Sequence, residues 1–499
     1  MAKKFKISPP SNVELLKEYH KLLIKKRIKQ SRLLEKVLRK RPVRTLSGVA
    51  VVSLFTKPYP CPGKCIFCPT QKGLPKSYLK GEPAAERALK LKFDPFWQVK
   101  KRVESLEKQG HPTDKIEIRV IGASFSFYPK KYKIWFFSNI FAAANEQKKT
   151  KKTNLVVLKK EQKLNEKAKN RIVGISIETR PDLIDNKEIL LMRELGVTMV
   201  ELGVQTVFDD ILEKNKRGHG TKETIQATKL LKDAGFKVMY QMMPNLPFST
   251  PEKDFFAFKE ILRNPAYKPD WLKIYPCVVC KNTELYQIWK KGKYKPYSDK
   301  QLINLVIKIK QIVPYWVRIA RLFRDIPAPQ IEAGCKISNL REVVQEEMKK
   351  RGLRCRCIRC REVRERYSPK EKIYLFREDY QSSDGKEIFI SFENKNRTKL
   401  YAFLRLRIPA DPFIKVLKNS AIIRELHTYG QMVPLKEKVI APQHKGLGKR
   451  LIKNAEEIVQ KEFGLNKIAA ISGVGVRDYY RKLGYRLKEE YMIKNLRSK

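Results

Sequence analysis

The chain has 499 residues, 42% of them hydrophobic, which is enough for about two to four domains with cores of their own. Lys and Arg number 107 against 52 Asp and Glu, so the formal net charge is +55. This excess predicts a polyanionic partner, either a nucleic acid or an acidic membrane surface. The alternative cause is the lysine-rich proteome of a thermophile.

The sequence also bears on the compartment. There is no run of about eighteen apolar residues, so no membrane span is predicted. The start, MAKKFKISPP, lacks the apolar stretch of a signal peptide. Nine cysteines, an odd number in tight clusters, favour metal chemistry over disulfides. We therefore expect a cytoplasmic protein.

Residues 1–46 are basic and carry apolar residues at helical spacing. A plain pair of surface helices and an arm that grips phosphates explain this pattern equally well. The lysine-rich insertion at 145–170 is predicted to be mobile or to face phosphates.

From residue 47 onward, apolar runs alternate with amphipathic helical stretches. The runs are 47–55, 115–125, 171–182, 198–206, 237–247 and 271–277. Repeated strand–helix units predict an α/β fold with a parallel sheet, curved into a partial barrel. Active sites of such folds lie at the C-terminal ends of the strands.

The pattern changes after residue 371. Runs at 387–394, 400–409 and 421–433 predict antiparallel strands, followed by a glycine turn that opens a helix. These elements predict a compact α+β domain of their own.

Cys61, Cys65 and Cys68 follow the first predicted strand with the spacing C-x3-C-x2-C. A structural zinc usually takes four protein ligands, and no fourth Cys or His lies nearby. A [4Fe–4S] cluster held by three cysteines leaves one iron open. Structural zinc remains the alternative.

This spacing behind the first strand of a parallel barrel resembles the radical S-adenosylmethionine (SAM) family, in which SAM binds the open iron. The resemblance implies that residues at successive strand ends contact SAM. For each residue alone, strand-end capping explains the position as well. The residues are Gly122, Glu178, Thr179, Arg180 and Gln205.

The segment from Gln443 to Arg450 reads Q-x-x-G-x-G at the turn into a helix. Glycines there let backbone N–H groups approach a pyrophosphate, and the helix N-terminus adds positive charge. With the later YYRKLGY, the segment resembles the GNAT acetyltransferase domain, which binds acetyl-CoA. Tyr479 and Tyr480 would then lie near the thioester, although both suit a core as well.

A chain that combines both resemblances is similar to the catalytic subunits of the Elongator complex. The segments ETRPD, NKRGH, MMPNLP and RELHTYG match that family in this order. The match implies that Lys115 reaches acetyl-CoA from the radical SAM domain. It further implies that the CoA site is lined by Glu425, Leu426, His427, Thr428, Gln443, Gly446, Leu447, Gly448, Lys449 and Tyr480.

Two features depart from the eukaryotic members of that family. The first cysteine gap is short, and RCRCIRC keeps thiols that those members have lost. We therefore expect a prokaryotic member that acts without other Elongator subunits. Cys355, Cys357 and Cys360 are predicted to bind a structural zinc, with Cys335 or water as the fourth ligand. Free thiols are the alternative.

The resemblance implies an enzyme that makes 5-carboxymethyluridine at the wobble position of tRNA, from SAM radical chemistry, acetyl-CoA and an electron donor. Its partner would be the anticodon stem-loop. The alternatives are a protein lysine acetyltransferase and a non-catalytic tRNA-binding scaffold. The expected parts are a tRNA-binding arm (1–46), a radical SAM domain (47–334), a zinc-binding linker (335–370) and a GNAT domain (371–499).

Overall fold

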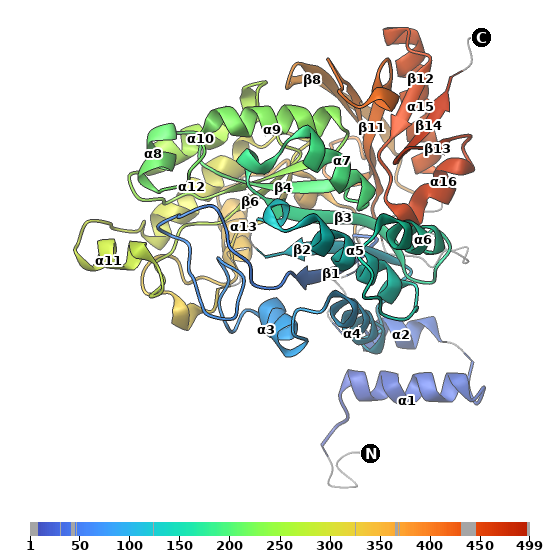
Figure 1. The fold of residues 1–499 in the computed structure, drawn as a ribbon, viewed down its shortest axis with the longest axis horizontal. Coiled ribbons are helices and arrows are strands. Elements are labelled where there is room, and N and C mark those ends of the chain that lie inside the picture. Colours follow the sequence, from blue (N-terminus) through green and yellow to red (C-terminus); the bar gives the residue numbers. More distant parts are fainter. Residues whose placement is uncertain are drawn as a thin grey trace.

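The computed structural model describes residues 8–29, 31–40, 45, 47–122, 124–324, 326–364, 368, 370–430 and 446–496. Within them the chain forms two sheets of seven strands each. In Figure 1 the strands of the first sheet run across the middle of the molecule, and the arrowhead of β1 points away from the second sheet.

The first sheet is parallel throughout, with its strands in chain order. The strands are β1 (Ala50–Phe55), β2 (Lys115–Ile121), β3 (Arg171–Thr179), β4 (Met199–Gln205), β5 (Lys237–Met242), β6 (Trp271–Ile274) and β7 (Arg318–Arg321). This confirms the predicted partial barrel. The seventh strand was missed because its four residues include two arginines and show no apolar run.

Helices cover this sheet and bury their apolar faces against it. The helices are α3 (Pro83–Lys90), α4 (Pro95–Lys108), α5 (Lys130–Ala144), α6 (Leu155–Asn165), α7 (Asn186–Glu194), α8 (Asp209–Lys214), α9 (Thr221–Asp233), α10 (Pro251–Arg263), α11 (Glu284–Lys290) and α12 (Asp299–Ile312). Helix α5 is buried almost all round because α4 and α6 pack on it.

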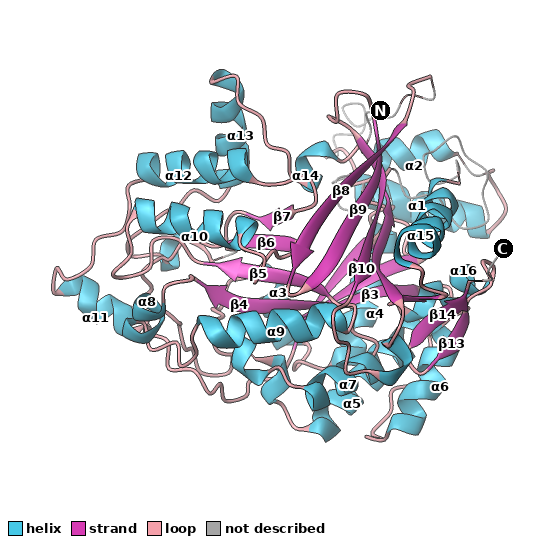
Figure 2. Ribbon diagram, turned by 90° about the horizontal axis from the view of Figure 1, so that it is seen from above, coloured by secondary structure: helices cyan, strands magenta, loops and turns pink. Residues whose placement is uncertain are grey.

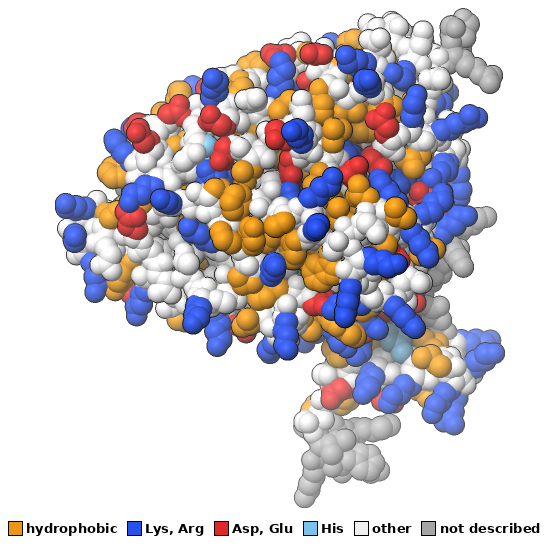
Figure 3. Space-filling view, in the orientation of Figure 1, with side chains coloured by type: hydrophobic (Ala, Val, Ile, Leu, Met, Phe, Trp, Pro, Cys, Tyr) orange, Lys and Arg blue, Asp and Glu red, His pale blue; other side chains and the backbone are white. Residues whose placement is uncertain are grey.

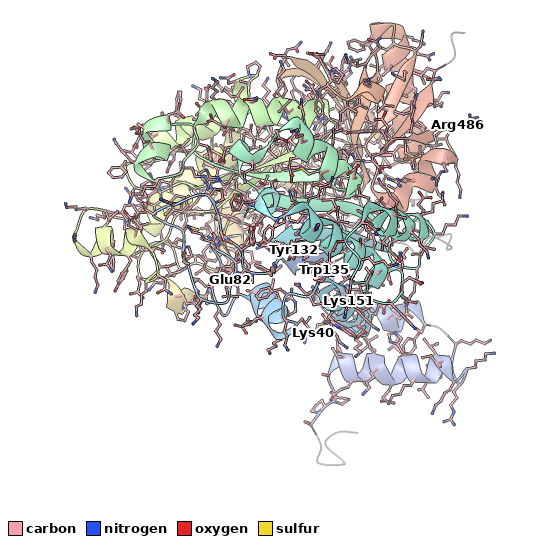
Figure 4. The ribbon with its side chains drawn as sticks, viewed as in Figure 1. Lys40, Glu82, Tyr132, Trp135, Lys151 and Arg486 are labelled. Carbon is pink, nitrogen blue, oxygen red and sulfur yellow. The ribbon has the colours of Figure 1, made fainter. Side chains whose placement is uncertain are left out.

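The insertion is ordered in part, contrary to the predicted mobile segment, while the phosphate-facing alternative stays a prediction. Residues of α6 form a regular helix with Leu158 in the core, and Asn145 Nδ2 donates to the carbonyl of Glu161 (2.8 Å). Trp135 Nε1 donates to the carbonyl of Thr150 (3.2 Å), next to the exposed Lys151 that Figure 4 labels. Apolar packing therefore fixes part of a segment whose lysines alone suggested a mobile loop.

The second sheet is mixed. In Figure 2 its long strands β8, β9 and β10 run beside the first sheet. Its strands are β8 (Tyr374–Ser382), β9 (Gly385–Glu393), β10 (Leu400–Ile408), β11 (Ala421–Thr428), β12 (Lys467–Ala470), β13 (Arg486–Lys488) and β14 (Tyr491–Asn495), and its helices are α15 (Leu447–Phe463) and α16 (Arg477–Arg481). Its neighbours are antiparallel except β11 and β12, which pair in parallel. The predicted α+β domain is confirmed.

Two further pairs of helices complete the described chain. In the basic arm, α1 (Asn12–Ile24) and α2 (Arg32–Leu38) pack together through the buried Leu16 and Tyr19, and α1 projects from the body in Figure 1. In chain order, α13 (Leu340–Lys350) and α14 (Ile358–Arg361) come between the two sheets, and they pack on α12 and on β7 respectively. No described helix combines the length and the apolar character that a membrane crossing needs.

Buried ion pairs join the two sheets. Arg407 of β10 donates to Asp233 at the end of α9 (2.6 Å), and Arg424 of β11 donates to Asp270 before β6 (2.9 Å). All four side chains are almost fully buried. Buried charges need such partners, so these pairs hold the second sheet in one position against the first.

Candidate functional sites

The first cavity lies at the C-terminal ends of the parallel strands. The predicted residues that line it are Cys61, Cys65, Cys68, Glu178, Thr179, Arg180 and Gln205. They come from the loop after β1 and from the ends of β3 and β4, whose carboxyl ends meet at one edge of the sheet. The structure therefore brings the three thiols and four of the five strand-end residues together.

Charged donors surround the cysteine loop. Arg217 Nη1 donates to Cys65 Sγ (3.4 Å), and Arg217 Nε donates to His219 Nε2 (2.9 Å). Burial and the neighbouring Arg217 lower the pKa of His219 to about 4. The neutral ring thus accepts a hydrogen bond that orients the guanidinium toward the cysteine sulfur.

Glu178 is the centre of a buried polar network on the floor of this cavity. Its carboxylate accepts hydrogen bonds from Tyr78 Oη (2.7 Å), Gln241 Nε2 (3.0 Å) and Lys273 Nζ (3.0 Å). Burial alone would raise the pKa of Glu178, but Lys273 and Tyr78 outweigh burial and hold it below its usual range. Glu178 is therefore a fixed anion.

Two polar atoms in this cavity have no partner within the described chain. They are Nη1 of Arg180 and Oε1 of Gln205, and both side chains are buried. Buried polar groups normally have partners, so these atoms indicate a ligand with both acceptors and donors. A Cβ at Gly63 would overlap Arg180 Nη1, which leaves glycine as the residue that fits beside it. Three thiols with such a polar surround fit a [4Fe–4S] cluster that carries SAM.

Gly122 does not line this cavity. It ends β2 with a φ of +124°, and a Cβ there would overlap the Thr56 hydroxyl. Thr56 also donates to the Gly122 carbonyl (3.0 Å). The glycine thus brings the ends of β1 and β2 together, and a direct contact with SAM stays a prediction.

The second cavity, about 500 Å³, lies at the opposite ends of the strands, against the second sheet. The predicted residues that line it are Lys115, Glu425, Leu426, His427, Thr428, Gly446, Gly448, Lys449, Tyr479 and Tyr480. Lys115 begins β2, whereas all the others belong to the second sheet and its helices. One cavity is therefore shared by two parts of the chain about three hundred residues apart.

Diverging strands open this cavity. β11 pairs with β12 only over Ala421–Ile423, whereas it pairs with β10 as far as Thr428. Helix α15 begins in the gap, and Gly446 at its start has a φ of +68°. The N–H groups of a helix's first turn have no partner within the helix, so they can bind an anion. A Cβ on Gly448 would lie 2.9 Å from Tyr479 Oη, so the glycine allows this close approach.

One predicted CoA residue lies elsewhere, and another cannot be placed. The Leu447 side chain is buried in the core of the second sheet and does not line the cavity. It packs inward because it is the first apolar residue of the α15 face. Gln443 lies outside the described residues.

Lys115 and Tyr479, two titratable groups of this cavity, are half-buried. Burial lowers the pKa of Lys115 and raises the pKa of Tyr479 to about 12. His427 Nε2 lies 2.8 Å from the Ser47 carbonyl, which ties β11 to the segment before β1. Glu425 accepts a hydrogen bond from Arg405 Nε (2.8 Å). A lysine and a tyrosine thus face a space bounded by both sheets.

The other cysteine triad lies between the sheets. The sulfurs of Cys355, Cys357 and Cys360 lie within 4.8 Å of one another, and among the described residues Cys335 is not part of this group. Lys310 Nζ donates to Cys360 Sγ (3.7 Å). Three converging thiols suit zinc, and the metal and its fourth ligand stay predictions.

The sequence assigned no role to several residues in and around the first cavity. Arg217 and His219 belong to the segment NKRGH, which matches the Elongator family but was given no function. Tyr78 carries no local signal, because its importance depends on meeting Glu178 from a distant segment, and Lys273 meets the same carboxylate from β6. A buried lysine in a strand, flanked by apolar residues, was the available clue.

The chain was compared with known proteins. The family model described as the Radical SAM superfamily matches residues 59–258, and the Radical SAM C-terminal domain matches residues 269–350. A tRNA uridine(34) acetyltransferase of Methanocaldococcus infernus is 48% identical, over 98% of this chain and 92% of that protein. Elongator complex protein 3 of Homo sapiens is 39% identical, over 92% of this chain and 86% of that protein.

A solved structure gives the same result for the fold. The archaeal Methanocaldococcus infernus Elp3 with an N-terminal deletion matches with a TM-score of 0.80 and 45% identity, covering 91% of this chain and all of that one. The similarity therefore extends over both sheets and the cysteine segment between them.

Proposed function

The chain belongs to the Elongator complex protein 3 family, and on this premise we propose that it is a radical SAM enzyme that converts the wobble uridine of tRNA to 5-carboxymethyluridine with acetyl-CoA. The observation that carries the proposal is the placement of the two cavities at opposite ends of one parallel sheet. A reaction that joins a radical reagent to an acetyl donor needs both.

In this proposal Cys61, Cys65 and Cys68 hold a [4Fe–4S] cluster, and Glu178, Thr179, Arg180 and Gln205 surround SAM. When bound, the cluster and SAM supply one-electron hydrogen-abstraction chemistry, for which an electron donor is required. The chain itself positions the ligand: Lys273 and Tyr78 hold Glu178 ionised as an acceptor, and Arg180 offers an N–H that has no partner among the described residues.

The second cavity would bind acetyl-CoA. The start of α15 suits its pyrophosphate, and the diverging β11 suits its pantetheine arm. Lys115 and Tyr479 would meet the acyl end between the two sheets. Binding between two parts of the chain would make the acetyl group available to the barrel.

The remaining charge suits tRNA. Figure 3 shows Lys and Arg side chains spread over one face and gathered around α1. We divide the chain into the arm 1–46, the radical SAM domain 47–334, the cysteine linker 335–370, which would bind zinc, and the GNAT domain 371–499. Action without other Elongator subunits belongs to the same proposal.

The test is mass spectrometry of tRNA nucleosides after anaerobic incubation. We expect 5-carboxymethyluridine only when reduced protein, SAM, acetyl-CoA and tRNA are all present. Acetylated lysines on added protein, with unmodified tRNA, would instead favour a lysine acetyltransferase. Binding of tRNA without formation of any new nucleoside would favour a non-catalytic tRNA-binding scaffold.

A further inference from the structure

A third cavity, about 430 Å³, opens in the side of the partial barrel. In the described chain β1 pairs only with β2 and β7 only with β6, so these edge strands leave a gap. The cavity fills that gap and shares Tyr78, Glu178, Tyr275 and Arg324 with the cysteine cavity. Glu82, labelled in Figure 4, belongs to its wall at the start of α3.

The wall of this cavity is strongly cationic. Eight of the lining side chains are Arg or Lys, and three are carboxylates, so an anionic ligand is favoured. Two of the three carboxylates, Glu178 and Glu201, are already paired with Lys273. Arg318 and Arg119 are paired with Glu362 and Glu117 outside the lining, and an excess of cations remains. The cationic residues are Arg87, Arg102, Arg119, Lys273, Arg318, Arg321, Arg324 and Arg359.

Several buried donors in this wall have no hydrogen-bond partner in the described chain. They are Nε of Arg318, Nε of Arg359 and Nε1 of Trp271. Arg318 is only 6% exposed, and its guanidinium lies 4.8 Å from the centre of the Trp271 ring. Native structures rarely leave such donors unmatched, so a ligand with acceptor oxygens fits here.

Arg359 reaches this wall from the cysteine segment. It lies between Cys357 and Cys360, and the neighbouring backbone is fixed because Ile358 N donates to the Val317 carbonyl (2.9 Å) beside β7. Arg356 of the same segment faces the other way and lines a separate pocket with Cys355 and Cys360. The triad thus separates two arginines onto opposite faces.

We propose that the arginine-lined cavity binds a backbone phosphate of the substrate RNA beside the nucleotide that is modified, and that the cysteine segment serves to hold Arg359 for this contact. The inference rests on the proposed function and names a contact within it. Guanidinium groups recognise phosphate oxygens through paired N–H donors, and phosphate contacts fix the position of a nucleic acid. The gap between β1 and β7 is where a splayed nucleotide would enter.

The first experiment compares Arg359→Gln with the matched control Arg356→Gln in the full-length protein loaded with its cluster. Binding of a fluorescein-labelled anticodon stem-loop RNA is measured by anisotropy over a range of salt concentrations. We expect Arg359→Gln to weaken binding roughly tenfold and to reduce the salt slope by about 0.7 to 0.9, the loss of one phosphate contact. Arg356→Gln should stay within about twofold of wild type.

The second experiment removes the phosphate charge instead of the arginine. Stem-loops with a single neutral methylphosphonate on either side of the wobble nucleotide are bound to both proteins. One of these positions should weaken wild-type binding by a similar factor and leave Arg359→Gln unaffected, because the two changes delete the same contact. Metal content and apparent Tm show whether Arg359→Gln is folded. The methylphosphonate measurement on the wild-type protein tests the contact even if that variant does not fold.

The outcomes separate this inference from the proposed function. If wild type modifies tRNA but neither methylphosphonate nor Arg359→Gln changes binding, the phosphate site is wrong. If Arg359→Gln weakens acetyl-CoA binding and spares RNA, the anion belongs to the cofactor and the inference is overturned. If both changes weaken RNA binding but no modified nucleoside forms, the phosphate site stands and the proposed function fails.

Discussion

At the scale of single residues, Arg217 and His219 show how a buried histidine directs its neighbour. His219 stays neutral because burial and Arg217 lower its pKa, so its ring nitrogen accepts the Arg217 hydrogen bond. Arg217 then donates to Cys65. A donor to a cysteine sulfur also tunes any cluster held there.

The cysteine loop leads to a direct prediction. Cys65→Ala should abolish the visible absorbance of the reconstituted protein and its SAM cleavage, because one of three cluster ligands is lost. Cys280→Ala, a buried thiol outside the first cavity, should keep both. Absorbance spectra after anaerobic reconstitution decide the matter, and an unchanged Cys65→Ala spectrum would contradict the assignment.

Lys115 leads to a second prediction. Lys115→Ala should weaken acetyl-CoA binding roughly tenfold, since a hydrogen bond from a charged group contributes about 1.5–3 kcal/mol. The cluster absorbance should stay the same, because Lys115 lies at the other end of β2. The exposed Lys101→Ala is the control, measured by calorimetry alongside it. Equal affinities in all three proteins would rule out a bridging lysine.

At the scale of elements, the cysteine segment joins the two sheets through its backbone and side chains. Arg361 donates to the Tyr315 carbonyl before β7 (2.6 Å) and to Glu393 of β9 (2.5 Å), and Glu362 is ion-paired with Arg318 of β7. A metal held by the triad would lock these contacts, because bound metal stabilises the folded arrangement of its ligands.

Metal analysis tests this element. Cys357→Ser should lose about one equivalent of zinc, and Cys335→Ser should retain it, because Cys335 lies outside the triad and burial raises its pKa to about 11. Elemental analysis after chelation compares the two variants with wild type. Zinc lost equally from both would make Cys335 the fourth ligand.

The arm is the second element with a testable role. Its cations Lys17, Lys25, Lys26 and Arg27 are exposed, whereas Leu16 and Tyr19 anchor it. We expect deletion of residues 1–40 to weaken tRNA binding roughly tenfold, the loss of a few phosphate contacts. Changing the four cations to Gln should do nearly the same without disturbing the anchor. Equal affinities at matched salt would give the arm another role.

At the scale of the whole molecule, buried ion pairs fix how the two sheets meet. Asp270 lies between Arg424 and Arg405 of the second sheet. Burial alone would raise its pKa, but Arg424, Lys232 and Arg405 hold it well below the usual range. Its stabilising effect is therefore complete above the ordinary Asp pKa and is lost as the pH falls through the lowered value.

Asp270→Asn should destabilise the protein at pH 7 by about 3–5 kcal/mol, since it leaves buried arginines without their anion. Differential scanning calorimetry should show a lower apparent Tm, and the gap to wild type should shrink below about pH 4. Asp379→Asn, which alters a surface pair with Arg377, should change stability by less than about 1 kcal/mol. If the difference in apparent Tm between Asp270→Asn and wild type stayed the same at acidic pH, the ionised carboxylate would not be the source of the stabilisation.

The sequence by itself determined the strands, the cysteine triads and the glycine turn, because periodicity and spacing are local properties that side-chain chemistry sets. It did not reveal the seventh strand, whose four residues are held by pairing with β6. Tertiary structure alone decided that Lys115 faces Tyr479, that Lys273 meets Glu178, and that Arg359 enters the barrel while Arg356 leaves it. These contacts join segments that are far apart in the chain. They depend on how the two sheets pack against each other, and local sequence patterns do not encode that packing.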